Sequence, residues 1–336
     1  MTGFLPWHEP LRQRLFSLRR GDRLPHAMLL SGPKHVGKRE FAAATAAFLL
    51  CQQPTDHGHC GTCDNCLLFA AGTQPDFQHL LPWERKNGKP IRIDERRLII
   101  IDQVRDMIDW AGQTAQRGGM KVVIIQPAEQ MNNAAANALL KCLEEPTSGM
   151  LLMLVSDTPG RLLPTIRSRC QHLDFVLPER DQSLEWLARE CPERDADTLS
   201  LLLSIAGGAP LAVTVDFDDA YLARRQEVAS AVEQLVRGGN PLSAASAFAR
   251  GDAITDITIM ASVFADALRL SLTSSENSIK NKDLTGLLRT IVQTMPTARL
   301  VQCVDVIERE RRAVAGPSNP NIGLLFEAMF VELAGL

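Results

Sequence analysis

The chain has 336 residues, of which 45% are hydrophobic and 22% charged, with a formal net charge of −3. This length exceeds the usual size of one domain and predicts two or three domains with a substantial core. The composition excludes an intrinsically disordered chain, and we expect no membrane span because every apolar stretch is short or interrupted. The slightly acidic balance argues against a dominant nucleic-acid-binding surface, which would carry a basic excess.

The start of the chain and the cysteines bear on the cellular compartment. Residues 6–9 include a proline, a histidine and a glutamate where a signal peptide would need an apolar core, which predicts a cytoplasmic protein. Four of the eight cysteines lie between Cys51 and Cys66, and the other four are scattered. This distribution favours a metal site together with free thiols over a disulfide framework.

The first predicted elements are a strand over residues 26–31 and a helix over residues 39–50, joined by a glycine-rich turn. The turn from Gly32 to Lys38 has the G-x-x-x-x-G-K spacing of a phosphate-binding loop, in the strand, loop and helix context that the motif requires. Gly32 and Gly37 would let backbone N–H groups surround phosphate oxygens, and Lys38 would reach the terminal phosphates.

Two parts of a complete ATP site are missing from this pattern. Arg39 stands where a Ser or Thr hydroxyl normally holds Mg²⁺, and arginine has no acceptor atom for a cation. The strand predicted over residues 121–125 is followed by Gln126 and Pro127 instead of acidic residues. We therefore predict no ATP hydrolysis. Two interpretations of the loop stay open: a vestigial nucleotide site that uses Lys38, or a strand-to-helix turn retained for packing.

A cysteine cluster follows the first helix. Cys51, Cys60, Cys63 and Cys66 have the spacing C-x₈-C-x₂-C-x₂-C in a short polar segment. Four thiolates at this spacing can supply the closed tetrahedral shell of a structural Zn²⁺ site. The alternative is four unligated thiols or a redox relay. Because metal binding supplies folding energy where a segment has no core, we expect the module of residues 51–66 to unfold when any one cysteine is lost.

The remaining elements of the first half predict a parallel sheet with helices on both faces. Further strands are expected at residues 97–101, 121–125, 151–156 and 171–175, separated by helical stretches. A helix predicted over residues 133–145 ends with Glu144 and Glu145, which suit either a basic partner or solvent.

A basic segment lies between the cysteine cluster and the later strands, and its members are Arg85, Lys86, Lys89, Arg92, Arg96 and Arg97. It surrounds Asn87 and Gly88, which form a hairpin signal. The segment is interpreted either as a solvated loop or as a stretch near DNA. After a linker at residues 177–179 we expect only helices.

Taken together, the motifs resemble those of the delta-prime subunits of bacterial DNA polymerase III, within the AAA+ clamp-loader family, over about the first 210 residues. The resemblance rests on four motifs, which are Leu49–Cys51, Pro75–Phe77, Asn137–Pro146 and Ser168–Cys170. It implies an α/β AAA+ (RecA-like) domain at residues 1–176 with a zinc-binding insertion, a small helical lid domain at 177–212 and an all-α collar or oligomerisation domain at 213–336.

The same resemblance implies a role for Arg169. In the family this arginine is an arginine finger, presented in trans to ATP held by a neighbouring motor subunit, and a guanidinium can bridge phosphate oxygens bidentately. A surface ion pair is the alternative for an arginine at such a place. Family ATPases carry acidic residues at positions 126 and 127, and a Gly-Ser-Leu-Arg segment where this chain has Gly207–Pro210.

The implied protein is a non-catalytic delta-prime subunit of the polymerase holoenzyme, with Zn²⁺ as structural cofactor. Its expected partners are the gamma/tau motor subunits and the delta subunit, and through the complex the sliding clamp and primed DNA. One alternative is an ATP-hydrolysing motor subunit of the gamma/tau type, with an unconventional metal ligand near Arg39 or Glu129. A free-standing zinc-dependent DNA-binding module is a second alternative.

Overall fold

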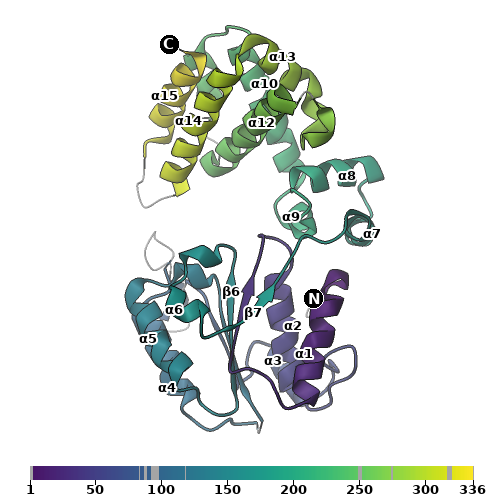
Figure 1. Cartoon of the computed structure of the whole chain (residues 1–336), viewed down its shortest axis with the longest axis vertical. Coiled ribbons are helices and arrows are strands. Elements are labelled where there is room, and N and C mark those ends of the chain that lie inside the picture. Colours follow the sequence, from purple (N-terminus) through teal and green to yellow (C-terminus); the bar gives the residue numbers. More distant parts are fainter. Residues whose placement is uncertain are drawn as a thin grey trace. The chain divides into compact units, whose positions relative to one another are not determined.

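The computed structural model describes residues 3–82, 84–86, 89–91, 98–117, 119–248, 252–273, 275–315 and 320–335. The chain divides into two compact units, Met1–Gln182 and Ser183–Leu336 (Figure 1). The first unit contains the sheet, and all regular elements described in the second are helices. The finer division at residues 176 and 212 stays a prediction.

A five-stranded parallel sheet with the order β2-β5-β6-β1-β7 forms the centre of the first unit. Its strands are β1 (Ala27–Ser31), β2 (Phe77–Leu80), β5 (Lys121–Ile125), β6 (Met150–Ser156) and β7 (Gln171–Asp174). Every residue of β1, β5 and β6 is buried. Strands buried on both faces require helices on both faces, which is the architecture that the sequence predicts.

Helices cover the two faces of this sheet as Figure 1 shows, with α1 and α2 on one side and α4 and α5 on the other. The helices of the first unit are α1 (Glu9–Arg20), α2 (Lys38–Leu50), α3 (Asp64–Ala70), α4 (Ile101–Ala111), α5 (Asn133–Glu144) and α6 (Pro164–Arg167). On the second side, Met107 and Leu139 pack with Val123 and Leu152 of the sheet in one apolar core. The helix predicted over residues 133–145 is confirmed to within one residue.

The prediction of a strand at residues 97–101 is wrong for its described part. Ile99 makes only an isolated parallel bridge with Met131, and Ile101 already begins α4. The Gln103 side chain accepts a hydrogen bond from Ile100 N at 3.0 Å, so the apolar run leads into a helix start. The strand that pairs with β5 is instead β2, where Gln78 and His79 interrupt the apolar pattern.

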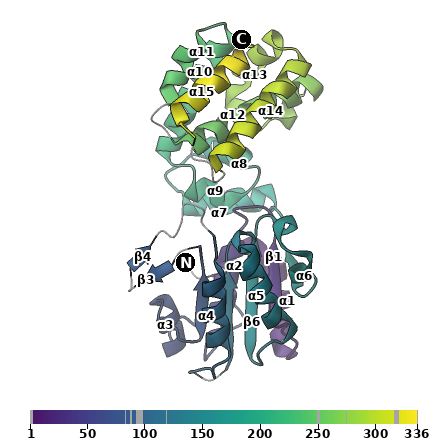
Figure 2. The same cartoon turned by 90° about the vertical axis from the view of Figure 1, so that its left-hand side faces the viewer.

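The residues on either side of the hairpin signal at positions 87 and 88 form two paired strands. β3 (Glu84–Lys86) pairs antiparallel with β4 (Lys89–Ile91), and Figure 2 shows the pair beside the first unit's helices. Asn87, Gly88, Arg92, Arg96 and Arg97 lie outside the described residues. The interpretations of this basic segment as solvated or close to DNA therefore stay predictions.

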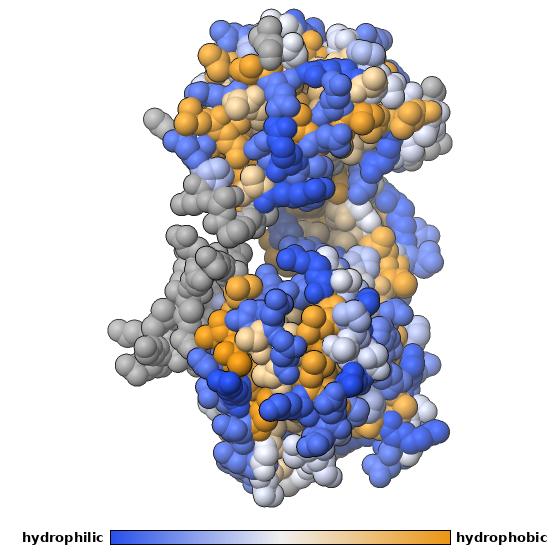
Figure 3. Space-filling view, turned by 60° about the vertical axis from the view of Figure 1, so that its left-hand side comes forward, coloured by the Kyte–Doolittle hydropathy of each residue, from blue (hydrophilic) through white to orange (hydrophobic). Residues whose placement is uncertain are grey.

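In the second unit, the helices from α10 onward form a bundle around one continuous apolar core, which contains no residue of α7, α8 or α9 (Figure 2). From α7, which crosses the boundary between the units, its helices are α7 (Arg180–Glu190), α8 (Ala196–Ile205), α9 (Pro210–Val215), α10 (Asp219–Val236), α11 (Pro241–Ala245), α12 (Ala253–Thr273), α13 (Thr285–Thr294), α14 (Thr297–Ala315) and α15 (Ile322–Ala334). On the face of this unit seen in Figure 3, hydrophilic residues cover much of the surface, with apolar residues between them. Among the described residues, no helix has the length and apolarity needed to cross a membrane.

A buried polar network fixes the connection between α12 and α13. Arg225 is 2% exposed and pairs with Asp283, and its guanidinium also donates to Asn281 Oδ1 at 2.9 Å. Asp266, fully buried, accepts hydrogen bonds from the backbone N–H groups of Lys280 and Asn281 at 2.7 and 2.8 Å. Because each buried charge here has partners, the network holds an irregular segment in one conformation.

Candidate functional site

The phosphate loop lies between β1 and α2, and its glycines are required by packing. Gly32 has φ 147° and Gly37 has φ 92°, values that L side chains rarely adopt. A Cβ atom at Gly32 would lie 2.2 Å from the carbonyl oxygen of Phe175, and one at Gly37 would lie 2.5 Å from Leu5 Cδ1. The close approach of other chain segments therefore explains both glycines without any bound phosphate.

The N-terminal segment packs directly against this loop. Trp7 Nε1 donates a hydrogen bond to the carbonyl oxygen of Val36 at 2.8 Å, and His8 Nε2 lies 3.2 Å from the same oxygen. His8 is fully buried between the rings of Phe41 and Phe175, with centroid distances of 5.4 and 5.5 Å. Burial lowers the pKa of His8 to about 4, so the ring is neutral at physiological pH.

The first unit is expected to lose stability in mild acid. Burial also lowers the pKa of His79 on β2 to about 4, whereas an unfolded histidine titrates near ~6.5. Between these values the unfolded chain binds protons that the folded chain excludes, so the free energy of unfolding is preserved above about pH 7 and falls as pH decreases toward 4, by up to ~1.4 kcal/mol per pH unit for each histidine.

Urea unfolding midpoints between pH 7.5 and about 4.5 measure this effect. His79→Gln is expected to flatten the pH profile, and His172→Gln, which replaces an exposed histidine, is the matched control. A wild-type midpoint that stays constant down to pH 4.5 would contradict the prediction.

Lys38, the lysine of the motif, is buried with its side chain 3% exposed. Its ammonium donates to the carbonyl oxygens of Gly32 at 2.8 Å and Pro33 at 2.5 Å, and it forms an ion pair with Asp157 Oδ1 at 2.6 Å. A lysine ammonium has three N–H donors, and these three oxygens engage all of them. The structure thus brings Gly32, Gly37 and Lys38 together with an acid that the sequence analysis did not single out.

Asp157 could have been found from the order of the strands. It directly follows β6, which pairs with β1 so that Ser156 lies opposite Ser31. In a parallel sheet the residues after the carboxyl ends of neighbouring strands meet at one edge, which is where ligand sites form. A polar residue just after β6 is therefore expected beside the phosphate loop, but only once β6 is known to neighbour β1.

The positions that hold Mg²⁺ in a complete site carry unsuitable groups here. Arg39 is exposed and Gln126 is half-buried. Glu129, near which the motor alternative would need an unconventional metal ligand, accepts hydrogen bonds from Asp157 N at 3.0 Å and from the Thr158 hydroxyl at 3.3 Å. Its carboxylate thus helps to hold the turn after β6.

The four cysteines of the cluster converge, as their spacing predicts. Cys51 directly follows α2, Cys63 immediately precedes α3 and Cys66 lies in the first turn of α3. The sulfurs are therefore presented by the ends of two helices and by the turn at Cys60. All four Sγ atoms lie within 4.8 Å of one another. Separations of 3.6 Å for Cys51–Cys60 and 3.9 Å for both Cys51–Cys63 and Cys60–Cys66 are too long for disulfides.

These separations fit a bound metal ion. Four sulfurs placed tetrahedrally at about 2.3 Å from Zn²⁺ are about 3.8 Å apart, close to the observed spacing. Hydrogen bonds from the backbone N–H groups of Thr62 and Cys63 lower the pKa of Cys60 to about 6, whereas burial raises the pKa of Cys51 and Cys66. A cation among the sulfurs favours the thiolate form of each. The donor set therefore suits a structural zinc site.

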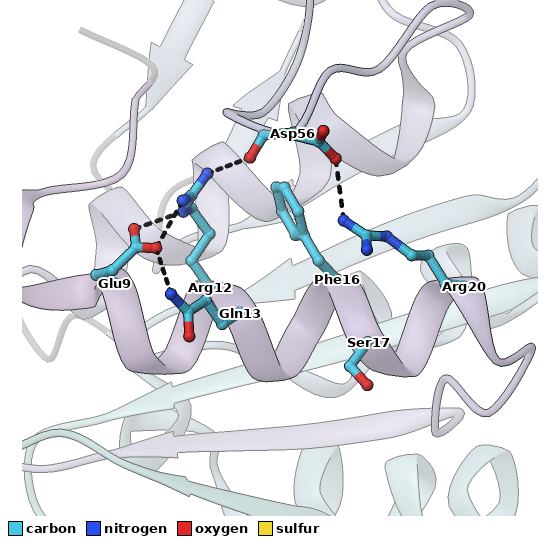
Figure 4. Close-up of a pocket in the computed structure, with 7 residues that line it drawn as sticks. All are labelled: Glu9, Arg12, Gln13, Phe16, Ser17, Arg20 and Asp56. Carbon is cyan, nitrogen blue, oxygen red and sulfur yellow. Dashed lines mark hydrogen bonds and ion pairs between the residues drawn. The ribbon is translucent and has the colours of Figure 1, made fainter.

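The cysteine module is also tied to α1 and α2. Arg12 donates a hydrogen bond to the carbonyl oxygen of Asp56, and Arg20 forms an ion pair with the Asp56 carboxylate at 2.9 Å (Figure 4). The buried Asn65 side chain donates to the Leu50 carbonyl oxygen at 2.8 Å. Contacts on both sides thus anchor the module to the first unit.

Arg169 lies on the surface of the first unit after α6, between Ser168 and the buried Cys170. Its guanidinium forms an ion pair with Glu144 Oε1 at 2.8 Å and donates to the Thr165 carbonyl oxygen at 3.0 Å. For Glu144 the sequence suggested either a basic partner or solvent, and neither interpretation included this contact within the chain. The arginine side chain is 36% exposed and that of Glu144 is 51% exposed, so solvent screens the pair.

Replacing Glu144 with glutamine is expected to change stability little. Exposed ion pairs contribute about 0–1 kcal/mol, and the Thr165 carbonyl contact of Arg169 is retained. Thermal unfolding of Glu144→Gln should therefore agree with wild type to within about 2–4 °C. A larger loss of stability would show that the pair is a structural contact and that Arg169 is not readily available to another ligand.

The comparisons with known proteins agree with this geometry. A family model described as "DNA polymerase III, delta subunit" matches residues 7–179, and one described as "DNA polymerase III, delta subunit, C terminal" matches residues 219–334. The DNA polymerase III subunit delta' of Pseudomonas aeruginosa is 39% identical over 342 aligned residues, which cover 100% of this chain and 99% of that protein. The Escherichia coli subunit delta' is 32% identical and covers 98% of this chain and 94% of its own length.

Among solved structures, a DNA polymerase III gamma subunit-related protein from Thermotoga maritima is similar at a TM-score of 0.42 and 17% identity, covering 96% of this chain and 98% of that one. With a parallel sheet covered by helices on both faces and a loop after β1, the chain is a DNA polymerase III subunit, as both family models indicate. Within that class, the chain belongs to the delta-prime subunit family of DNA polymerase III.

Proposed function

We propose that the chain is a non-catalytic clamp-loader subunit that helps load the sliding clamp onto primed DNA and completes the ATP site of a neighbouring motor subunit with Arg169. The observation that carries the proposal is the contrast between the two ATP-related sites of the first unit. The loop at Lys38 lacks the groups that hold Mg²⁺, whereas Arg169 is half-buried at the surface with its side chain 36% exposed.

We expect no ATP hydrolysis by the chain itself, because it lacks the groups that would compensate the negative charge of the transferred phosphoryl group. Phosphoryl transfer places negative charge on the transferred group, and Mg²⁺ together with lysine and arginine normally compensates it. Arg39 has no acceptor for the metal, and the residues after β5 are Gln126 and Pro127. The ammonium of Lys38 is engaged by oxygens of the chain. The loop therefore supplies neither the metal nor a free lysine.

The surroundings of Arg169 support a role in trans. A guanidinium carries five N–H donors and a permanent charge, and the contacts with Glu144 and Thr165 leave other donors of the group for a ligand. The Thr165 carbonyl and the short helix α6 hold the residue near the surface. A phosphate group could thus replace the screened Glu144 carboxylate as the bidentate partner of Arg169.

Zinc has a structural role in this proposal. Four cysteine ligands complete a tetrahedral shell and leave no position for substrate. When bound, Zn²⁺ would cross-link the end of α2 to the start of α3 through Cys51, Cys60, Cys63 and Cys66. The module would therefore stabilise the first unit and take no part in chemistry.

The helical remainder of the chain is assigned to assembly. We place the lid at residues 177–212 and the collar at 213–336, as the family resemblance implies. At the segment where family ATPases have an arginine, this chain has Gly207 and Gly208, both with positive φ. The proposed partners are the gamma/tau motor subunits and the delta subunit in the cytoplasm. Clamp and DNA would be reached through that complex.

Reconstitution tests this function. The purified chain alone is expected to show no ATP turnover, whereas adding it to gamma and delta subunits should restore clamp loading on primed DNA. The carboxylate of Asp157 favours the motor alternative, because it is an acid in direct contact with the loop lysine Lys38. ATP hydrolysis by the isolated chain that disappears in Lys38→Ala would establish that alternative and overturn the proposal.

A further inference from the structure

We propose that Asp157 acts as an internal substitute for phosphate, whose carboxylate occupies Lys38 and closes the loop to nucleoside polyphosphates. This inference goes beyond the proposed function, which requires only that the chain does not hydrolyse ATP. It assigns the closure of the loop to one residue. It also implies a latent anion site that neutralisation of that residue would open.

The first support is the complete engagement of the Lys38 ammonium. Two loop carbonyls and the Asp157 carboxylate lie 2.5 to 2.8 Å from Nζ, and the side chain is 3% exposed. A phosphate could reach Nζ only by displacing one of these oxygens. The carboxylate is the one that resembles phosphate, since it is an anion that accepts charge-assisted hydrogen bonds.

The second support is that the fold places Asp157 at this point. The pairing of Ser31 with Ser156 puts the next residues, Gly32 and Asp157, side by side at the carboxyl edge of the sheet. The backbone N–H of Asp157 donates to Glu129 at 3.0 Å, which holds the turn. The carboxylate of Asp157 is therefore positioned by the sheet and by Glu129.

The third support is electrostatic. A nucleoside triphosphate would bring several negative charges close to Asp157 and Glu129, and Arg39 provides no ligand for a compensating Mg²⁺. The Asp157 side chain is 37% exposed, so water and salt reduce the repulsion without removing it. Both the loss of the lysine contact and this repulsion oppose nucleotide binding.

The rest of the loop retains the features of an anion site. The first N–H groups of α2 have no carbonyl partners within the helix, as at every helix start. Gly32 and Gly37, both with positive φ, give the loop before this helix its turn conformation. Neutralising Asp157 should free Lys38 to join these groups. The ligand class is then a nucleoside triphosphate or inorganic pyrophosphate.

The experiment is a binding titration of the isolated full-length chain with a fluorescent ATP analogue at physiological salt, with and without Mg²⁺. Asp157→Asn keeps the shape of the side chain and removes its charge, and it is expected to bind the analogue at least about tenfold more tightly than wild type. Inorganic pyrophosphate should compete. Asp106→Asn, an exposed acid on α4, is the matched control and should behave as wild type.

A second substitution ties the gain to the lysine. Lys38→Met in the Asp157→Asn background should return binding to the wild-type level. If the Asp157→Asn variant does not fold, Asp157→Ser replaces it in both measurements. Equal affinity of wild type and a folded Asp157 variant would overturn the inference. Tight Mg·ATP binding by wild type that weakens in Asp157→Asn would also overturn it, because Asp157 would then be a metal ligand.

These outcomes do not depend on the proposed function. The titration uses the isolated chain and never involves Arg169 or a partner subunit. Failure of Arg169 to act in the assembled clamp loader would leave the role of Asp157 intact, and an open phosphate loop in wild type would leave the role of Arg169 intact.

Discussion

If Arg169 is the arginine finger proposed above, replacing it with alanine is expected to slow hydrolysis at the one ATP site that it would complete by roughly a thousandfold, within the range known for arginine fingers. The physical reason is that the guanidinium would neutralise the charge that develops on the transferred phosphoryl group. Water molecules are not held in position for this before the reaction, so they cannot replace the guanidinium. The decrease in total ATP turnover should be smaller, because other motor subunits keep their own sites. Clamp loading should be strongly impaired.

The measurement is pre-steady-state ATP hydrolysis and clamp loading on primed DNA by the reconstituted complex. Arg169→Lys keeps the charge but loses the planar fork, and it should recover only a small part of the rate. Arg161→Ala, which removes an exposed arginine from the same connection between β6 and β7, is the matched control. If Arg169→Ala assembles normally and loads clamps at the wild-type rate, Arg169 is an ordinary surface residue.

Removing one cysteine of the cluster should have the largest effect on stability. Zinc binding in small structural sites corresponds to about 10–16 kcal/mol of apparent free energy, and the segment around Cys51–Cys66 has few apolar residues to replace it. We expect Cys63→Ser to bind less than one zinc per chain and to expose residues 51–66 to proteolysis. The anchors at Asp56 and Asn65 are too weak to hold the segment alone.

Zinc content by elemental analysis and limited proteolysis measure this effect. Treatment of wild type with a strong chelator should reproduce the behaviour of Cys63→Ser. Cys191→Ala, which removes a cysteine distant in sequence from the cluster, should keep one zinc per chain. A wild-type chain that contains no zinc when purified under reducing conditions, yet resists proteolysis at residues 51–66, would refute the zinc assignment.

The fold was largely predictable because its strongest signals are local. β1, β5 and β6 are continuous apolar runs between turns, and each is recovered to within a residue or so of its predicted bounds. The errors fall where tertiary contacts override the pattern. β2 is a strand because β5 offers it an edge, although its own sequence alternates poorly. Residues 99–101 resemble a strand, but the Gln103 side chain at Ile100 begins a helix there.

The candidate site was predictable only in part for the same reason. The cysteines and the loop lysine belong to compact motifs, so their spacing alone brings them together. The partners of these groups come from distant segments. Asp157 lies 119 positions after Lys38 and Glu144 lies on a different helix from Arg169. Such pairs depend on strand order and helix packing, which no local pattern encodes.

The saturated ammonium of Lys38 has a consequence for how this loop changes during evolution. A shorter or uncharged residue at position 38 would leave two loop carbonyls and the Asp157 carboxylate without the buried ammonium that they share as donor. Folding alone therefore favours the lysine and the glycines at these positions, without any bound nucleotide. Searches based on the G-x-x-x-x-G-K motif will continue to group this loop with working ATPases.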